Sequence, residues 1–224
     1  MKKYQNPVFH HKHPYPPFIP QNATKLIVGT LPPPRFSTGD LKPDDVNFCY
    51  GSRDGQLWKI LDTIFNLQLK YETTQVAIDQ RKAFLKQRGI GICDIVASAY
   101  REKIDATDLG MKEVELRDLI GYIENHPKVD TLLFTGGNSK NGPEYFFRQL
   151  LKKQSIKLEV IENEVPRIHT CTINGRAIKT VSLTAPSGSA NRAVGSLPLY
   201  KQLKASDPSF TTFDYRVMQY REFF

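Results

Sequence analysis

The chain of 224 residues carries a formal net charge of +8 and has a pI near 9.3, with 40% hydrophobic residues. Its length suits one domain, with or without an arm, and its three scattered cysteines exclude a disulfide framework and a zinc site. No apolar run approaches the roughly 18 residues of a membrane span, and the start lacks the apolar segment of a secretory signal, so we expect a cytoplasmic protein. The basic charge favours polyanionic partners, with a solubilising surface charge as an equal alternative.

Residues 1–24 are expected to form an extended arm that packs on the core, because prolines interrupt any helix there. His10, His11 and His13 are residue types that bind metals, but so short a tract is only a compositional signal. The simpler interpretation is an extended segment that lies on the rest of the protein, and we expect no bound metal.

From residue 25 onward, strand-like and helical patterns alternate, which predicts a single domain over 25–224. Apolar strand-like runs occur at 25–29, 91–96, 130–135, 156–161 and 178–183. Apolar residues at helical spacing occur around 57–64, 116–123, 143–151 and 197–203, and Asn174-Gly175 marks a hairpin turn within 165–179. This order predicts an α/β fold: a three-layer α/β/α sandwich around a mainly parallel sheet of about four to five strands.

The first strand-like run ends at Gly29 and leads into a stretch suited to a ligand pocket. Thr30 and Leu31 follow the strand directly, so their backbone N–H groups can face a ligand at the sheet edge. Pro32-Pro33-Pro34 stiffens the loop, and Tyr50 offers an aromatic face on which a planar base can stack. The alternative for Tyr50 is a half-buried loop aromatic whose hydroxyl group is hydrogen-bonded.

A second candidate stretch follows the last strand-like run. The small residues of Pro186-Ser187-Gly188-Ser189 allow this loop to approach a phosphate backbone closely, and its free N–H groups can bind phosphate oxygens. Asn191 and Arg192 continue the loop into a predicted helix, where Arg192 is either a functional residue or an ordinary surface arginine.

Two polar residues lie near the ends of the middle strand-like runs. Asp94 is unusual within 91–96, because a buried carboxylate needs hydrogen-bond donors, and we expect it to order the pocket structurally. Asn138 follows 130–135 and can either read a base edge through its amide or cap a turn.

Taken in order, these motifs resemble those of the uracil-DNA glycosylase superfamily, and are most similar to its mismatch-specific uracil and deoxyinosine branches. The first motif there is a Gly-x-x-Pro loop followed by an aromatic-Gly segment and Phe-Trp-Lys, which corresponds here to Gly29, Pro32, Tyr50-Gly51 and Leu57-Trp58-Lys59. The Pro-Ser loop resembles the second motif, which enters the minor groove and supports extrusion of a base. The resemblance implies that Arg192 fills the space that the extruded base leaves.

The chain departs from this family at the positions that support catalysis. Hydrolysis of the bond between a flipped base and its sugar requires an acceptor that positions water near C1′. The family's first-loop Asp or Asn corresponds to Leu31, and the Asn of the deoxyinosine branch corresponds to Ser52. We therefore predict Asp54 as the water-activating carboxylate, with Ser52 holding the water and Asp45 as the other candidate. Asp54 could instead close a turn with Gly55 or cap the next helix.

The resemblance predicts a monofunctional DNA glycosylase that flips a deaminated base, uracil or hypoxanthine, out of DNA and hydrolyses its glycosidic bond during base excision repair. Damaged or mismatched DNA is the expected partner, the protein is expected to be a monomer, and no metal or cofactor is required. An alternative is a glycosylase-like module that binds nucleic acid without catalysis. A third is another α/β enzyme acting on a small nucleotide, although the dinucleotide and P-loop signatures are absent from the sequence.

Overall fold

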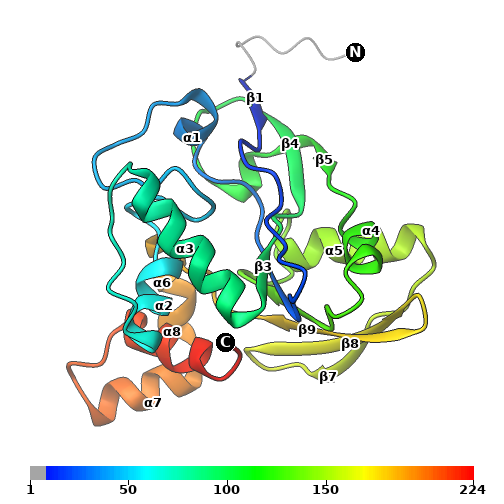
Figure 1. Cartoon of the computed structure of the whole chain (residues 1–224). Helices are drawn as coiled ribbons and strands as arrows, with labels where there is room; N and C mark the ends of the chain where they lie inside the picture. The colour runs from blue at the N-terminus through cyan, green and yellow to red at the C-terminus, as the bar shows by residue number, and fades with distance from the viewer. Residues whose placement is uncertain (1–8) are drawn as a thin grey trace.

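The computed structural model describes residues 9–224, and its centre is one mixed β-sheet (Figure 1). Its strands lie side by side in the order β3 (Ile90–Ile92), β2 (Lys25–Val28), β6 (Thr131–Phe134), β9 (Arg176–Ser182), β8 (Arg167–Ile173) and β7 (Glu159–Glu162). The first four are mutually parallel, whereas β8 and β7 are antiparallel additions. The mainly parallel sheet is therefore confirmed, but it has six strands rather than four to five.

The additional strand is the first half of the predicted hairpin. Strand β8 pairs with β9 along its whole length, from Arg167 opposite Ser182 to Ile173 opposite Arg176. Asn174 and Gly175 both have positive φ angles, of 46° and 73°, as a tight type I′ turn requires. The hairpin prediction is confirmed, and its first strand brings the sheet to six strands.

Alternating side chains of the parallel strands point to opposite faces of the sheet and build two cores. Leu26, Leu132 and Phe134 belong to one buried cluster, and Ile27 and Leu133 belong to the other. Because successive residues of a strand face opposite sides, a short continuous apolar run supplies both cores at once. Burying each such side chain contributes about 1.5–3 kcal/mol.

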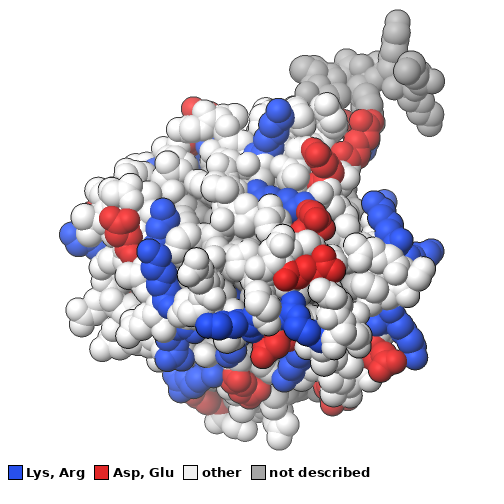
Figure 2. All heavy atoms as spheres, turned by 45° about the vertical axis from the view of Figure 1, so that its right-hand side comes forward, with Lys and Arg blue, Asp and Glu red and all other residues white. Residues whose placement is uncertain are grey.

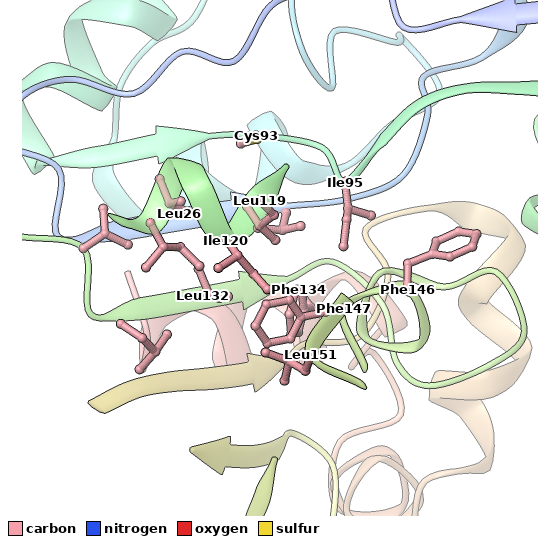
Figure 3. Packing of buried hydrophobic residues seen from close by; sticks show 14 of the residues in the cluster. Leu26, Cys93, Ile95, Leu119, Ile120, Leu132, Phe134, Phe146, Phe147 and Leu151 are labelled. Carbon is pink, nitrogen blue, oxygen red and sulfur yellow. The ribbon is translucent and has the colours of Figure 1, made fainter. Parts of the chain in front are cut away.

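Helices cover both faces of the sheet, as the three-layer prediction requires (Figure 1). One face is covered by α4 (Leu119–Asn125) and α5 (Pro143–Lys153), whose Leu119, Ile120, Phe147 and Leu151 meet Leu26 and Leu132 in Figure 3. The other face is covered by α2 (Leu57–Phe65), α3 (Gln75–Arg88) and α8 (Thr212–Arg221). Shorter helices α1 (Pro34–Thr38), α6 (Asn191–Ser196) and α7 (Pro198–Ser206) lie in the connections.

Helices α3 and α8 were not predicted, because neither presents a clean apolar stripe. Helix α3 buries the charged Arg81 together with Phe84 and Leu85, so the sequence of its buried face shows no continuous apolar pattern. Both helices nevertheless begin at a capping residue: the Thr74 hydroxyl accepts from the Ala77 N–H, and Thr211 forms a reciprocal capping box with Asp214. The capping residues were the available sequence signal for these two helices.

A second, three-stranded antiparallel sheet lies beside the first and was also not predicted. It consists of β1 (Phe9–Lys12), β4 (Val96–Arg101) and β5 (Lys112–Leu116), in that order. Strand β1 belongs to the N-terminal arm, so the described part of that arm, 9–24, packs on the core through a strand ladder as well as through extended backbone. Within the described residues, no helix is both long and apolar enough to cross a membrane.

Candidate functional site

A cavity of about 830 Å³ opens at the carboxyl ends of the parallel strands. Thr30 follows β2, Asp94 follows β3, Thr135 follows β6 and Ala185 follows β9, and all four residues line it. Parallel strands end at the same edge of a sheet, so residues that are far apart in the sequence converge here. Tyr50, Ser52 and Asp54 of the first motif line the same cavity, together with Pro186, Ser187 and Ser189 of the second.

One wall of the cavity is a hydrogen-bonded group centred on Asp94. One carboxylate oxygen of Asp94 accepts from the Gly29 N–H and from the Tyr50 hydroxyl, each at 2.9 Å, and Thr135 Oγ1 lies 3.0 Å from the same hydroxyl. Burial and the neighbouring Asp94 carboxylate raise the pKa of Tyr50 well above its ordinary value, so the phenol keeps its proton and donates. These contacts hold Tyr50 in the left-handed backbone region, at φ 57°.

Both carboxylate oxygens of Asp94 have partners within the protein. Its side chain is buried, and its second oxygen lies 2.9 Å from Nε2 of His13, which comes from the N-terminal arm. Gly29 also fits this arrangement closely, since a Cβ atom there would come within 2.1 Å of the Tyr50 hydroxyl oxygen. The glycine that follows β2 is therefore required for Tyr50 to reach Asp94.

The loop that carries Tyr50 is organised by a second carboxylate, Asp45. Asp45 is fully buried and accepts two hydrogen bonds from the Arg35 guanidinium, at 2.7 and 2.8 Å, and two from the backbone N–H groups of Lys42 and Arg53. Burial alone would raise the pKa of Asp45, but these hydrogen bonds outweigh it and lower the pKa to about 2. All its acceptor sites are occupied by the loop, which argues against Asp45 as the water activator.

The predicted residues Ser52 and Asp54 lie at the cavity rim beside the same arginine. Arg35 Nη2 donates to Ser52 Oγ at 2.8 Å and lies 3.6 Å from an Asp54 carboxylate oxygen. The Asp54 side chain is 68% exposed, so its carboxylate is accessible to a water molecule or a substrate group. The Asp54 N–H also donates to Ser52 Oγ, which makes this segment a tight turn as well.

The two motif loops touch although they are about 130 residues apart. Gln56 N–H donates to the Pro186 carbonyl at 2.9 Å, and Gly55 forms a short antiparallel bridge with Ser187. Arg216 of α8 also stabilises the second loop, because its guanidinium donates to the carbonyl groups of Ala185 and Ser187. Figure 1 shows helix α8 close to α6, which follows this loop.

Four predicted site residues, Gly29, Asn138, Asn191 and Arg192, are not among the residues that line the cavity. Asn138 is exposed beyond the end of β6, where its neighbours Ser139 and Lys140 line the cavity instead. The Asn191 side chain accepts a hydrogen bond from Arg216, and Arg192 is exposed on the first turn of α6. Leu31 lines the cavity while packing partly against the hydrophobic core.

Two charged residues at this site carry no motif in the sequence. Arg35 belongs to the short helix α1 after the proline run, and Asp108 lies in a short turn, η1 (Asp108–Gly110), between β4 and β5. Asp108 lines the cavity next to the first motif, because the Thr30 hydroxyl donates to its carboxylate at 2.7 Å. Only the packing of the second sheet against the first brings Asp108 here.

The histidines of the arm have partners within the protein. Arg101 Nε donates to Nδ1 of the buried His11, His13 bonds Asp94, and His10 stacks on Tyr100. Across 9–224, no group of three or more His, Cys, Asp or Glu residues is arranged to hold a metal ion. Basic and acidic side chains are interspersed on the face that Figure 2 shows, rather than separated into large regions of one sign.

Comparison with known proteins places these features in a family context. No family model matches the chain. It is 27% identical over 128 residues to the hypoxanthine DNA glycosylase of Methanosarcina barkeri, a match that covers 57% of this chain and 73% of that protein. A solution NMR structure from Methanosarcina acetivorans, of a protein provisionally named a uracil DNA glycosylase, has a TM-score of 0.53 at 18% identity and covers 92% of this chain and 98% of that one. The chain is therefore similar in part of its sequence to one DNA glycosylase, and in its fold to a protein provisionally named as another.

Proposed function

We propose that this protein is a DNA glycosylase that removes a deaminated base, uracil or hypoxanthine, from damaged or mismatched DNA and so initiates base excision repair. The observation that carries the proposal is the cavity at the strand ends, where both motif loops meet around Tyr50. Its volume of about 830 Å³ is within the range of cavities that hold small ligands, so a single extruded nucleotide is a suitable occupant. The similarity to a protein named hypoxanthine DNA glycosylase supports the same class of substrate.

In this proposal, the base leaves the duplex and stacks on Tyr50, whose ring is held by Asp94 and Thr135. The backbone of Thr30 and Leu31 faces its edge, whereas the Gly29 N–H and carbonyl are bonded to Asp94 and Ile95 and so only support this loop. The exposed carboxylate of Asp54 receives a water molecule that attacks C1′ as positive charge develops on the sugar, and Ser52 helps to hold that water. The reaction needs no metal or cofactor.

The Pro186 to Ser189 loop and Lys140 are proposed to contact the DNA backbone, because they line the cavity and because Gly188, Ser189 and Lys140 are exposed. Arg192 lies next to this loop, on the surface, which suits a residue that enters the duplex in place of the extruded base. Asn138 is exposed beside the cavity, so we propose a contact with DNA outside the base pocket for it, rather than with the base itself. The protein is proposed to act as a monomer.

A nicking assay tests this function directly. End-labelled duplexes that contain uracil, hypoxanthine, xanthine or thymine opposite each normal base are incubated with the protein and then treated with alkali, which cuts abasic sites. We expect cleavage at uracil or hypoxanthine, and we expect Asp54→Asn to reduce it by about 100-fold or more. Absence of cleavage across the panel, with salt-sensitive DNA binding retained, would instead support a binding module without catalysis.

A further inference from the structure

Asp108 is a carboxyl group on the cavity wall that belongs to neither motif loop. Its position is fixed by its own backbone: the Asp108 carbonyl accepts from Asn141 Nδ2 at 2.9 Å and from the Met111 N–H at 3.0 Å. Asn141 is itself buried and donates a second hydrogen bond to the Met111 carbonyl. These hydrogen bonds join the η1 turn to the segment that precedes α5 and keep the Asp108 side chain at the cavity.

The surroundings of this carboxyl group differ from those of an ordinary surface aspartate. Thr30 Oγ1 donates a hydrogen bond to it at 2.7 Å, so the donor that contacts this carboxyl group is a neutral hydroxyl. The positive charge of Arg101 acts on Asp108 in the direction that lowers its pKa. The Arg101 guanidinium itself lies 3.7 Å from the Asp105 carboxylate and donates to the Thr107 carbonyl. Burial raises the pKa of Asp108, and the nearby Asp94 raises it further, while the Thr30 hydrogen bond and Arg101 act in the opposite direction without cancelling the rise.

Two carboxyl groups with contrasting environments therefore border one cavity. Asp54 is 68% exposed and lies 3.6 and 3.9 Å from the Arg35 and Arg53 guanidinium groups. Asp108 is half-buried and receives its hydrogen bond from the neutral Thr30 hydroxyl. Enzymes that hydrolyse glycosidic bonds use pairs of this kind, in which the enclosed carboxyl group keeps its proton as an acid and the solvated one acts as a base.

We propose that Asp108 is the general acid that protonates the base as it leaves, an inference that rests on the proposed glycosylase function. The bond between C1′ and the base nitrogen breaks, its electron pair moves into the base, and the Asp108 carboxyl proton moves to a nitrogen or oxygen of that base. Water forms the new bond to C1′ and gives its proton to Asp54. Asp108 regains a proton and Asp54 loses one to solvent, so the enzyme returns to its starting state.

The test compares leaving groups, because a general acid matters most for a base that leaves poorly as an anion. Single-turnover excision rates are measured on uracil and on 5-fluorouracil, whose electron-withdrawing fluorine stabilises the departing anion, for the wild type, Asp108→Asn and Glu102→Gln. Asn keeps the shape of the side chain and can still accept from Thr30. Glu102 is a matched control, since it is an exposed acid in the same β4 to β5 connection and does not line the cavity.

We expect Asp108→Asn to slow uracil excision by about 100-fold or more, and 5-fluorouracil excision by less than about 10-fold, with Glu102→Gln unchanged on both. Equal losses on the two bases would overturn the proposal and assign Asp108 to binding or structure. Should the wild type excise no base in the full panel, the glycosylase function itself fails, and this inference fails with it. A wild type that is active, with an Asp108→Asn variant equally active on both bases, would refute the inference alone.

The pH dependence provides a test that does not depend on a stable Asp108 variant. A general acid must be protonated, so the wild-type rate on uracil should fall as pH rises through the pKa of Asp108, and fall less steeply on 5-fluorouracil. The Thr30 hydrogen bond lowers the pKa of Asp108, so Thr30→Val should move this fall in rate, the basic limb of the pH–rate profile, to higher pH. Identical basic limbs on the two bases, or no movement of the limb in Thr30→Val, would contradict the proton-donor role.

Discussion

Nε2 of His13 lies 2.9 Å from Oδ2 of Asp94, although the two residues are 81 positions apart in the chain. The Tyr15 N–H donates to the other ring nitrogen, Nδ1, so in the neutral ring Nε2 carries the hydrogen and donates to Asp94. The opposite oxygen of Asp94 holds the Tyr50 hydroxyl. The N-terminal arm is thus joined to the proposed base-stacking residue through one buried carboxylate.

Replacing His13 should therefore weaken both the fold and the site. His13→Ala leaves one buried oxygen of Asp94 without its donor, which should lower the free energy of unfolding by about 1–3 kcal/mol. His13→Gln retains an N–H donor on a side chain of similar reach and should recover at least half of this loss. Urea unfolding measures both effects, and His10→Ala serves as the control because His10 is exposed. Equal destabilisation by Gln and Ala would show that packing, and not the hydrogen bond, explains the contact.

Adding one methyl group at Gly29 should displace Tyr50. The new Cβ would lie 2.1 Å from the Tyr50 hydroxyl oxygen and 2.9 Å from both Asp94 Oδ1 and Thr135 Oγ1, so the ring has to leave its hydrogen-bonded position. If Tyr50 stacks on the base, Gly29→Ala should weaken binding of DNA with a non-cleavable extruded base by about 1–3 kcal/mol. Fluorescence anisotropy measures this affinity. Gly137→Ala is the control, since its Cβ meets no atom within 4 Å, and an equal affinity for the two variants would exclude Tyr50 as the stacking residue.

The Arg35–Asp45 pair should make stability depend on pH in the acid range. The pKa of Asp45 is about 2 in the folded protein and 3.8 as the ordinary value, so its contribution is fully present above about pH 5 and is lost as pH falls toward 2. The difference corresponds to roughly 2 kcal/mol of unfolding free energy. Urea unfolding of the wild type and Asp45→Asn between pH 7 and pH 2 should give curves that converge as pH falls. Curves that stay parallel would show that Asp45 is not held as a charged group.

The proposed role of Arg192 predicts a loss that depends on base pairing. A side chain that fills the space of an extruded base matters when a paired base must be removed from the stack, and much less on single-stranded DNA. Arg192→Ala should therefore slow excision from duplex DNA by about 10-fold or more while leaving the single-stranded rate within about twofold. Lys201→Ala removes an equal charge from α7 and is the control. Similar losses on both substrates would mean that Arg192 only contributes charge.

Local sequence patterns determined most of the elements that build the three-layer fold. The apolar run before Gly29 becomes β2, the Asn174-Gly175 turn forms a hairpin, and Pro143 begins α5. These features depend on interactions between residues close in sequence, namely side-chain periodicity and backbone preference, which the sequence displays directly. The same patterns identified the two loops that border the cavity.

Only the tertiary structure decided which polar groups meet in that cavity. His13, Asp94 and Tyr50 come from three separate segments, and Asp108 reaches the wall because β4 and β5 form a second sheet with the arm. Their hydrogen bonds join residues that are tens of positions apart, and such contacts produce no periodic pattern in the sequence. Burial, which decides both the pKa of Asp108 and the fixed position of Tyr50, exists only once the two sheets and their helices have packed together.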